Sequence, residues 1–141
     1  MKCSVNFGNI FDSLKIARMG LLFDVSENRL DDVRKRLQQN PNDVHLADAN
    51  GNSALHLAAE KGFTEMVKLL IDNGADLNAA NADPPKWSPL HYAAYEGHAD
   101  VVGLLVASGA IPDVQDSQGD TPESWALDWE NFKCAMILGK N

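Results

Sequence analysis

Histidine and cysteine are the side chains of this sequence best suited to metal binding or acid–base chemistry. The chain has four of the first and two of the second: His45, His56, His91, His98, Cys3 and Cys134. No two of them stand at the close spacing of a zinc-ligand pair, so no metal site is expected. The histidines at positions 56 and 91 fall at the same place in two similar segments, so repetition rather than catalysis explains them.

The sequence also lacks the motifs that mark the common catalytic and cofactor sites. It has no glycine-rich phosphate loop, no nucleophile elbow and no serine–histidine pairing. Acidic side chains such as Asp31, Asp32 and Asp100 fall on the expected solvent faces of helices. We therefore expect neither an enzyme nor a cofactor, and the elements that carry these residues are better understood as a scaffold.

Composition narrows the class of protein further. The chain has 141 residues, 45% of them hydrophobic, and a formal net charge of −8. That charge argues against a nucleic acid or an anionic membrane as partner, and it suits a protein partner with a basic surface. The sequence shows no signal peptide and no long apolar span. We therefore expect a monomeric protein of the cytoplasm, the nucleus or both, with free thiols at its two cysteines.

The clearest structural unit covers residues 48–80. It opens with an Asn-Gly turn at 50–51, where glycine can adopt a positive φ. Ser53 then marks the start of a helix, and Gly62 marks its end. Apolar residues at helical spacing predict a second helix over 64–73. Two such short helices cannot bury their apolar faces alone, so the unit needs stacked neighbours.

Similar units precede and follow this one, so the chain is an array of repeats. Leu55 recurs 35 residues later as Leu90, against a period of about 33 for an undisturbed repeat. The two extra residues lie in the loop between these units. We predict a repeat domain over 21–138, preceded by an N-terminal capping segment over 1–20 that could instead bind a partner. The predicted repeats cover about 21–47, 48–80, 81–115 and 116–138.

These units resemble the ankyrin repeat family, whose Thr-Pro-Leu-His-x-Ala motif recurs in them. The second repeat has SALHLA at 53–58, and the third has SPLHYA at 88–93. A weaker version, TPESWA, stands at 121–126. The resemblance implies an all-α ankyrin-repeat solenoid of about four helix-turn-helix repeats with short β-turn or hairpin tips. It also implies a structural role for the motif histidine, which in this family bridges the loop and the neighbouring repeat.

The two end repeats depart from the motif. In the first, Arg34 and Arg36 stand where the second repeat has apolar residues, as a terminal capping repeat requires in water. The basic run at 34–36 could instead bind an anionic ligand. In the last repeat Glu123 replaces the motif leucine, whereas the segment 134–138 stays apolar. We expect that final helix either to turn inward or to be covered by a partner or a downstream segment.

In the ankyrin family, the turn tips and the exposed ends of the first helices form a concave surface that binds other proteins. On this sequence that surface comprises the tips and first-helix ends of the second to fourth repeats. The expected partner-binding residues are Asn50, Asn52, Glu60, Lys61, Asp83, Pro84, Pro85, Lys86, Trp87, Tyr95, Glu96, Gln118, Asp128 and Trp129. Aromatic residues dominate interface hot spots, so we expect the tryptophans and tyrosines to form its centre.

The third tip and two further aromatic residues leave alternatives open. Its two adjacent prolines are expected to hold the loop in an extended, polyproline-like shape with Trp87 forward, unless the loop is a neutral insertion. Tyr92 and Trp125 map to half-buried family positions. They could contribute to binding or merely thicken the stack.

Two classes of function fit the resemblance. The first is an adaptor, scaffold or inhibitor that binds a protein partner. The second is the N-terminal ankyrin recruitment or regulatory domain of a longer multidomain protein whose catalytic part lies elsewhere. The apolar final helix favours the second, and the initiating methionine favours a natural N-terminus.

One asparagine suggests a modification. Asn78 follows Leu77 and stands eight residues after Leu70. In this setting it resembles the ankyrin asparagine that an intracellular oxygenase hydroxylates, so the resemblance implies a hydroxylation site.

Overall fold

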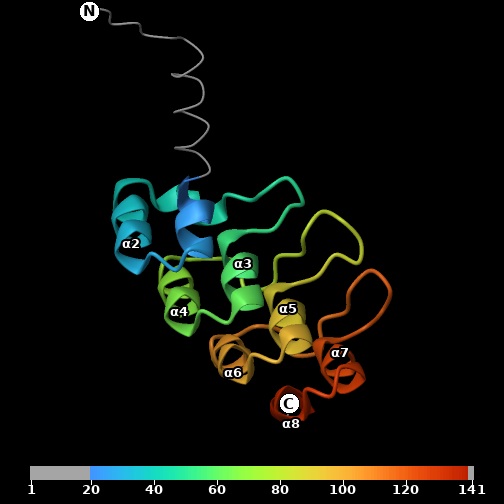
Figure 1. Cartoon of the computed structure of the whole chain (residues 1–141). Coiled ribbons are helices and arrows are strands. Elements are labelled where there is room, and N and C mark those ends of the chain that lie inside the picture. Colours follow the sequence, from blue (N-terminus) through green and yellow to red (C-terminus); the bar gives the residue numbers. More distant parts are fainter. Residues whose placement is uncertain (1–19, 140–141) are drawn as a thin grey trace, which may run out of the picture.

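The computed structural model describes residues 20–139, and over this range the chain is a row of stacked helices (Figure 1). The predicted capping segment at 1–20 therefore lies almost wholly outside the described residues. Residues 20–26 are helical. The elements that follow are α2 (Leu30–Gln39), η1 (Pro41–His45), α3 (Ala54–Lys61), α4 (Thr64–Asp72), α5 (Pro89–Glu96), α6 (Ala99–Ala107), α7 (Pro122–Asp128) and α8 (Phe132–Gly139). The predicted all-α repeat solenoid is confirmed.

The helices form two rows. Helices α3, α5 and α7 lie side by side in an inner row, and α2, α4, α6 and α8 follow one another in an outer row. The long loops before α3, α5 and α7 all project to the same side (Figure 1). Within residues 20–139 the β-type pairing at these tips is a single antiparallel bridge between Ala47 and Ser53. None of the helices in this range is long and apolar enough to span a membrane.

The repeated motif fixes both ends of the inner helices. Ser53, Ser88 and Thr121 each accept a hydrogen bond from the backbone N–H three residues later, which satisfies a donor at the helix start. Gly62 and Gly97 follow α3 and α5 in the left-handed conformation, with φ of 74° and 79°. A side chain would strain that conformation, so glycine stops the helix at these points.

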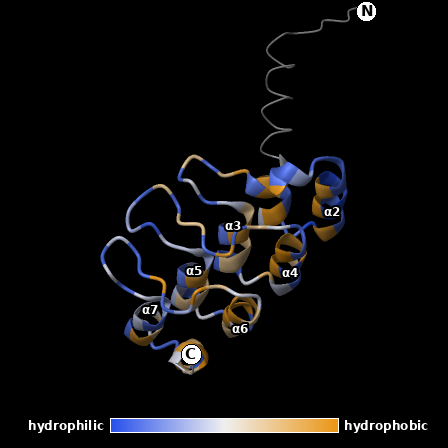
Figure 2. Ribbon diagram, turned by 180° about the vertical axis from the view of Figure 1, so that it is seen from behind, coloured by the Kyte–Doolittle hydropathy of each residue, from blue (hydrophilic) through white to orange (hydrophobic). Residues whose placement is uncertain are grey.

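The core lies between the two rows. On the inner helices it is built from small residues, and Ala58, Ala59, Ala93 and Ala94 are completely buried where α3 packs on α5. Small side chains let the two helix axes approach closely. The outer helices supply the bulk: Met66, Val67, Leu70, Val101, Val102 and Leu105. Figure 2 shows this apolar contribution on α4 and α6, whereas the projecting loops are mostly hydrophilic.

The three arginines of the first repeat form ion pairs within that repeat. The carboxylate of Asp24 is buried and lies 2.6 Å from Arg36 Nε and 3.8 Å from Arg29. Arg34 lies 3.0 Å from Asp31 on the same helix. Two of the three cations in the basic run at 34–36 are thus paired with acids of their own repeat, which leaves little charge for an anionic ligand.

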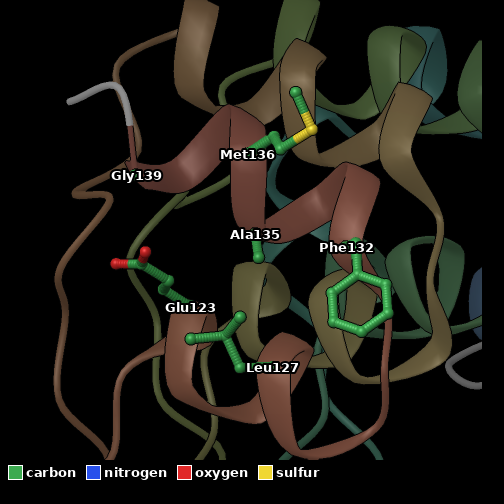
Figure 3. Close-up of a pocket in the computed structure, with 6 residues that line it drawn as sticks. All are labelled: Glu123, Leu127, Phe132, Ala135, Met136 and Gly139. Atoms are coloured by element: carbon green, nitrogen blue, oxygen red, sulfur yellow. The ribbon is translucent and has the colours of Figure 1, made fainter.

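The last helix turns part of its apolar surface inward. Cys134, Ala135 and Leu138 turn inward and are buried. Phe132 and Met136 remain 59% and 63% exposed. Together with Leu127 on α7 they line an open hollow of about 390 Å³ at the end of the stack (Figure 3).

Candidate functional site

A pocket of about 260 Å³ lies between the tips of the second and third repeats. We call it the tip pocket. Its lining residues are Asn50, Asn52, Asn81, Asp83, Pro84, Pro85, Trp87 and Tyr92. Six of the fourteen expected partner-binding residues therefore meet around one concavity, joined by a tyrosine from α5 and by an asparagine that the sequence did not single out.

The floor of the tip pocket is a closed hydrogen-bond network. The side-chain amide of Asn81 donates to Asn52 Oδ1 and to the Tyr92 hydroxyl, both at 3.0 Å, and that hydroxyl donates to Asn52 Oδ1 at 3.1 Å. Asn81 Oδ1 accepts from the Trp87 backbone N–H at 2.8 Å. Asn52 and Asn81 are both buried. Asn52, which we expected at the exposed tip surface, thus holds two tips together from below.

Asn81 could have been found by comparing the repeats. It stands 33 residues after Asp48 and 35 before Asp116, which are the steps between equivalent positions in the array. The two aspartates close their own tips by accepting backbone N–H groups two and four residues later. An amide at this position can donate as well as accept, so it can join neighbouring tips in a way that a carboxylate cannot.

The third tip does not adopt the expected extended shape. Residues 84–85 form a turn, and the backbone N–H of Lys86 donates to the Asp83 carbonyl at 2.8 Å. Trp87 does not project forward either. Its ring is half-buried, and its indole N–H donates to Asp116 at 3.1 Å. The expectation that the prolines hold this side chain forward is therefore wrong, because ring packing and the aspartate draw it back onto the third and fourth repeats.

All five tryptophans and tyrosines of the chain belong to one connected cluster, which we call the aromatic cluster. The Trp87 ring lies 5.0 Å from the rings of Tyr92 and Tyr95 and 5.1 Å from that of Trp125, measured between centroids. Tyr95 in turn lies 5.0 Å from Trp129. Trp129 is 55% exposed. The cluster thus runs from the floor of the tip pocket to an exposed indole at the end of α7.

Asp116 anchors the aromatic cluster to the fourth tip. Its Oδ2 accepts the indole N–H of Trp125 at 2.9 Å and that of Trp87 at 3.1 Å, while Oδ1 accepts the backbone N–H groups of Gln118 and Asp120. Burial alone would raise the pKa of this carboxyl. The four hydrogen bonds outweigh the effect of burial and hold the pKa of the Asp116 carboxyl below its usual value. The group is therefore charged at neutral pH.

The motif histidines form serine–histidine pairs, which the sequence analysis did not expect. His56 Nδ1 lies 2.9 Å from Ser53 Oγ, and His91 Nδ1 lies 2.8 Å from Ser88 Oγ. In both rings Nδ1 also accepts the serine backbone N–H. His56 Nε2 lies 2.9 Å from the Trp87 carbonyl oxygen, and His91 Nε2 lies 3.0 Å from the Asp120 carbonyl oxygen.

These pairs are helix caps that bridge repeats. A carbonyl can only accept, so Nε2 carries the proton and both ring nitrogens are engaged. Burial lowers the pKa of His56 and of His91, which keeps both rings neutral near pH 7. A third histidine, His98, reaches back to the Glu60 carbonyl at 2.8 Å. The bridging role that the family resemblance implied is therefore present in the geometry.

The carboxylates of the concave side form no ion pairs with the other described residues. Within residues 20–139 the ion pairs shorter than 4.0 Å all lie in the first repeat. Burial raises the pKa of the Tyr92 hydroxyl, and the charges of Glu60 and Asp48 raise it further, so both carboxylates act on the tip pocket. The exposed carboxylates of Asp83, Glu96 and Asp128 add to the same negative field.

The remaining expected residues lie around this surface without lining the tip pocket. Lys61 and Glu96 are exposed at the C-terminal ends of α3 and α5, and Lys86 and Gln118 are exposed at the third and fourth tips. Asn78 is also exposed, but its Oδ1 accepts the backbone N–H of Ile111 at 2.9 Å. Among residues 20–139 no group of three potential ligand side chains could hold a metal ion.

Stacked helix pairs whose loops project to one side define a helical repeat protein (Figure 1). The family model for "Ankyrin repeats (3 copies)" matches residues 21–116 and 80–141. The chain belongs to the ankyrin repeat family. This is generally a non-catalytic interaction fold.

Three similar proteins illustrate the settings in which such repeats occur. Human "Ankyrin repeat domain-containing protein 35" is 56% identical over 36 residues, which are 26% of this chain and 4% of that protein. "Serine/threonine-protein kinase VIK" of Arabidopsis thaliana is 35% identical over 69 residues, 48% of this chain and 16% of the kinase. Mouse "Protein phosphatase 1 regulatory subunit 12A" is 38% identical over 82 residues, 53% of this chain and 8% of that subunit. The chain thus matches only a small part of each.

Proposed function

We propose that this chain binds a protein partner with a basic surface, as an adaptor, scaffold or inhibitor, through the concave side of its second to fourth repeats. The observation that carries the proposal is the aromatic cluster, which reaches solvent at Trp129 beside carboxylates that form no ion pair with any other residue of the range 20–139. Aromatic side chains supply most of the binding energy in protein interfaces, and an unpaired acidic rim selects a basic partner and speeds its association.

The arrangement suits recognition for a second reason, which is its rigidity. The tips are joined to one another by hydrogen bonds from Asn81, and from the Ser117 backbone N–H to the Pro85 carbonyl at 2.7 Å. A surface that is already ordered loses little conformational freedom on binding. More of the contact energy then appears as affinity.

Affinity capture with four versions of the chain tests the proposal. The baits are the native chain, Trp129→Ala, the double variant Glu96→Gln/Asp128→Asn, and Phe23→Ala. The last is the matched control, because Phe23 is as exposed as Trp129, at 54% against 55%, but lies in the first repeat. We expect a protein that is enriched on the native and control baits and lost from the other two. Equal enrichment on all four would contradict the proposal.

A second candidate function is a recruitment domain within a longer protein. The observation that favours it is the open apolar hollow beside α8, where Leu127, Phe132 and Met136 are exposed (Figure 3). A further segment of a longer chain would bury this hollow. Mapping the boundaries of the full-length transcript tests this candidate: an open reading frame that continues past Asn141 supports it, and a stop codon there contradicts it.

A further inference from the structure

We infer that the tip pocket receives a single arginine side chain of the bound partner. The inference rests on the proposed function, and it specifies which chemical group of a basic partner is recognised and where. Four features of the pocket lead to it: its size, its aromatic wall, its unsatisfied acceptors and its preformed geometry.

The size of the pocket selects a side chain. Sites for cofactors and drug-sized ligands usually measure about 300–1,000 Å³. The tip pocket, at 260 Å³, falls just below that range and is open to solvent between two loops. It therefore suits one long side chain that enters from a partner lying across the tips.

The wall of the pocket offers aromatic surface and few donors. The indole N–H of Trp87 is taken by Asp116, and the hydroxyl of Tyr92 is taken by Asn52 and Asn81. Both rings line the pocket, so they offer an incoming group aromatic surface rather than a hydrogen-bond donor. Aromatic surfaces attract cations, and they favour the flat guanidinium group in particular.

The mouth of the pocket offers free acceptors. The side chains of Asn50 and Asp83 line it and have no hydrogen bond or ion pair among residues 20–139. A guanidinium has five N–H donors in a plane, enough to reach a carboxylate and an amide oxygen together. An anion would meet the field of Asp83, Asp48 and Glu60 and be repelled.

Arginine fits this combination better than lysine does. An ammonium group is compact and strongly hydrated, so its transfer onto an aromatic wall sacrifices more hydration than the transfer of a guanidinium. The nearby Lys86 does not line the pocket and so does not occupy it.

The pocket exists before any ligand arrives. Asn81 exchanges backbone and side-chain hydrogen bonds with Trp87, and the Ala82 backbone N–H donates to the Asn50 carbonyl at 3.0 Å. The first two bonds fix the shape of the third tip, and the third bond joins it to the second tip. An arginine that enters would not have to order a loop first.

Titration of the full chain with capped amino acids, followed by NMR, tests the inference. The probes are Nα-acetyl-arginine amide, the equivalent lysine amide, and the equivalent citrulline amide, which has the shape of arginine without its charge. We expect saturable shifts of the Asn50 side-chain amide and the Trp87 indole with the arginine probe, at millimolar affinity. The lysine and citrulline probes should bind at least about threefold more weakly. Equal binding of either would overturn the inference.

Two variants of equal charge complete the test. Asp83→Asn removes the acceptor at the mouth and should weaken the arginine probe about threefold or more. Asp100→Asn removes the same charge from the outer helix α6 and should leave that affinity unchanged. Equal effects of the two variants would also overturn the inference. If partner capture depends on Trp129 but the arginine probe does not bind, the arginine inference is refuted. The proposed function would still stand in that case.

Discussion

Replacing Asp116 with asparagine should destabilise the chain more than the same change at the equivalent position of the second tip. Asp116 and Asp48 have the same geometry toward their own tips, where Oδ1 accepts two backbone N–H groups at 2.9 Å. They differ at Oδ2. In Asp116 it accepts two indole N–H groups at 2.9 and 3.1 Å, whereas in Asp48 it has one contact at 3.5 Å with an asparagine amide.

The magnitude follows from that difference. An asparagine can keep the two backbone bonds through its oxygen, but its NH₂ group would then face two indole donors. A hydrogen bond to a charged group contributes about 1.5–3 kcal/mol, so losing two of them at a carboxylate that is only 7% exposed should cost about 3 kcal/mol. Asp48→Asn loses one weak contact and should cost about 1 kcal/mol or less. The gap of about 2 kcal/mol is a large fraction of a typical folding free energy.

Urea unfolding of the native chain and the two variants measures this gap. Far-UV circular dichroism reports the helices, and tryptophan fluorescence reports the aromatic cluster that Asp116 anchors. We expect Asp116→Asn to lower the midpoint strongly and to change the native fluorescence, and Asp48→Asn to do neither. Equal losses in the two variants would refute the reasoning, since it assigns the difference to the indole bonds alone.

Three further predictions concern the buried histidines, the tryptophans and Asn78. The free energy of unfolding should fall as the pH is lowered from about 7 to 5. Burial lowers the pKa of His91 in the folded state, so the unfolded state binds more protons in this range. One such histidine can contribute up to about 1.4 kcal/mol per pH unit. His91→Gln should reduce that slope, and a slope equal to that of the native chain would contradict the burial argument. Trp87→Ala should cost about 3 kcal/mol in urea unfolding and Trp129→Ala about 1 kcal/mol or less, so similar losses would show that the first ring does not support the fold. Intact-mass spectrometry of the native protein should show one added oxygen, which peptide fragmentation should locate at Asn78, and an unmodified mass would contradict the hydroxylation that the family resemblance predicts.

The repeats and their helices could be predicted because they depend on short-range rules. A hydroxyl cap, a helical run of small apolar residues and a stopping glycine are all set within about ten residues, and their recurrence gives the register. The cap hydroxyls of Ser53, Ser88 and Thr121 and the stops at Gly62 and Gly97 lie where the sequence places them.

The site could be predicted only in outline because its contacts join different repeats. The bonds from Asn81 to Asn52 and from Trp87 to Asp116 each connect residues 29 apart, and no local pattern specifies which side chain turns toward which neighbour. The prolines of the third tip suggested a projecting Trp87, but packing against four other rings outweighed that local preference. The register of the repeats did contain one usable signal, the change from aspartate to asparagine at Asn81.

The proposed binding surface is tested most directly by hydrogen–deuterium exchange of the native chain, alone and with the captured partner. The expected result is slower exchange in the tips and inner helices of the second to fourth repeats, above all in peptides covering 81–97 and 117–129. The outer helices α4 and α6 should be unchanged. Protection confined to α4 and α6, or to α8, would contradict the assignment of the acidic, aromatic concave side as the surface that binds the partner.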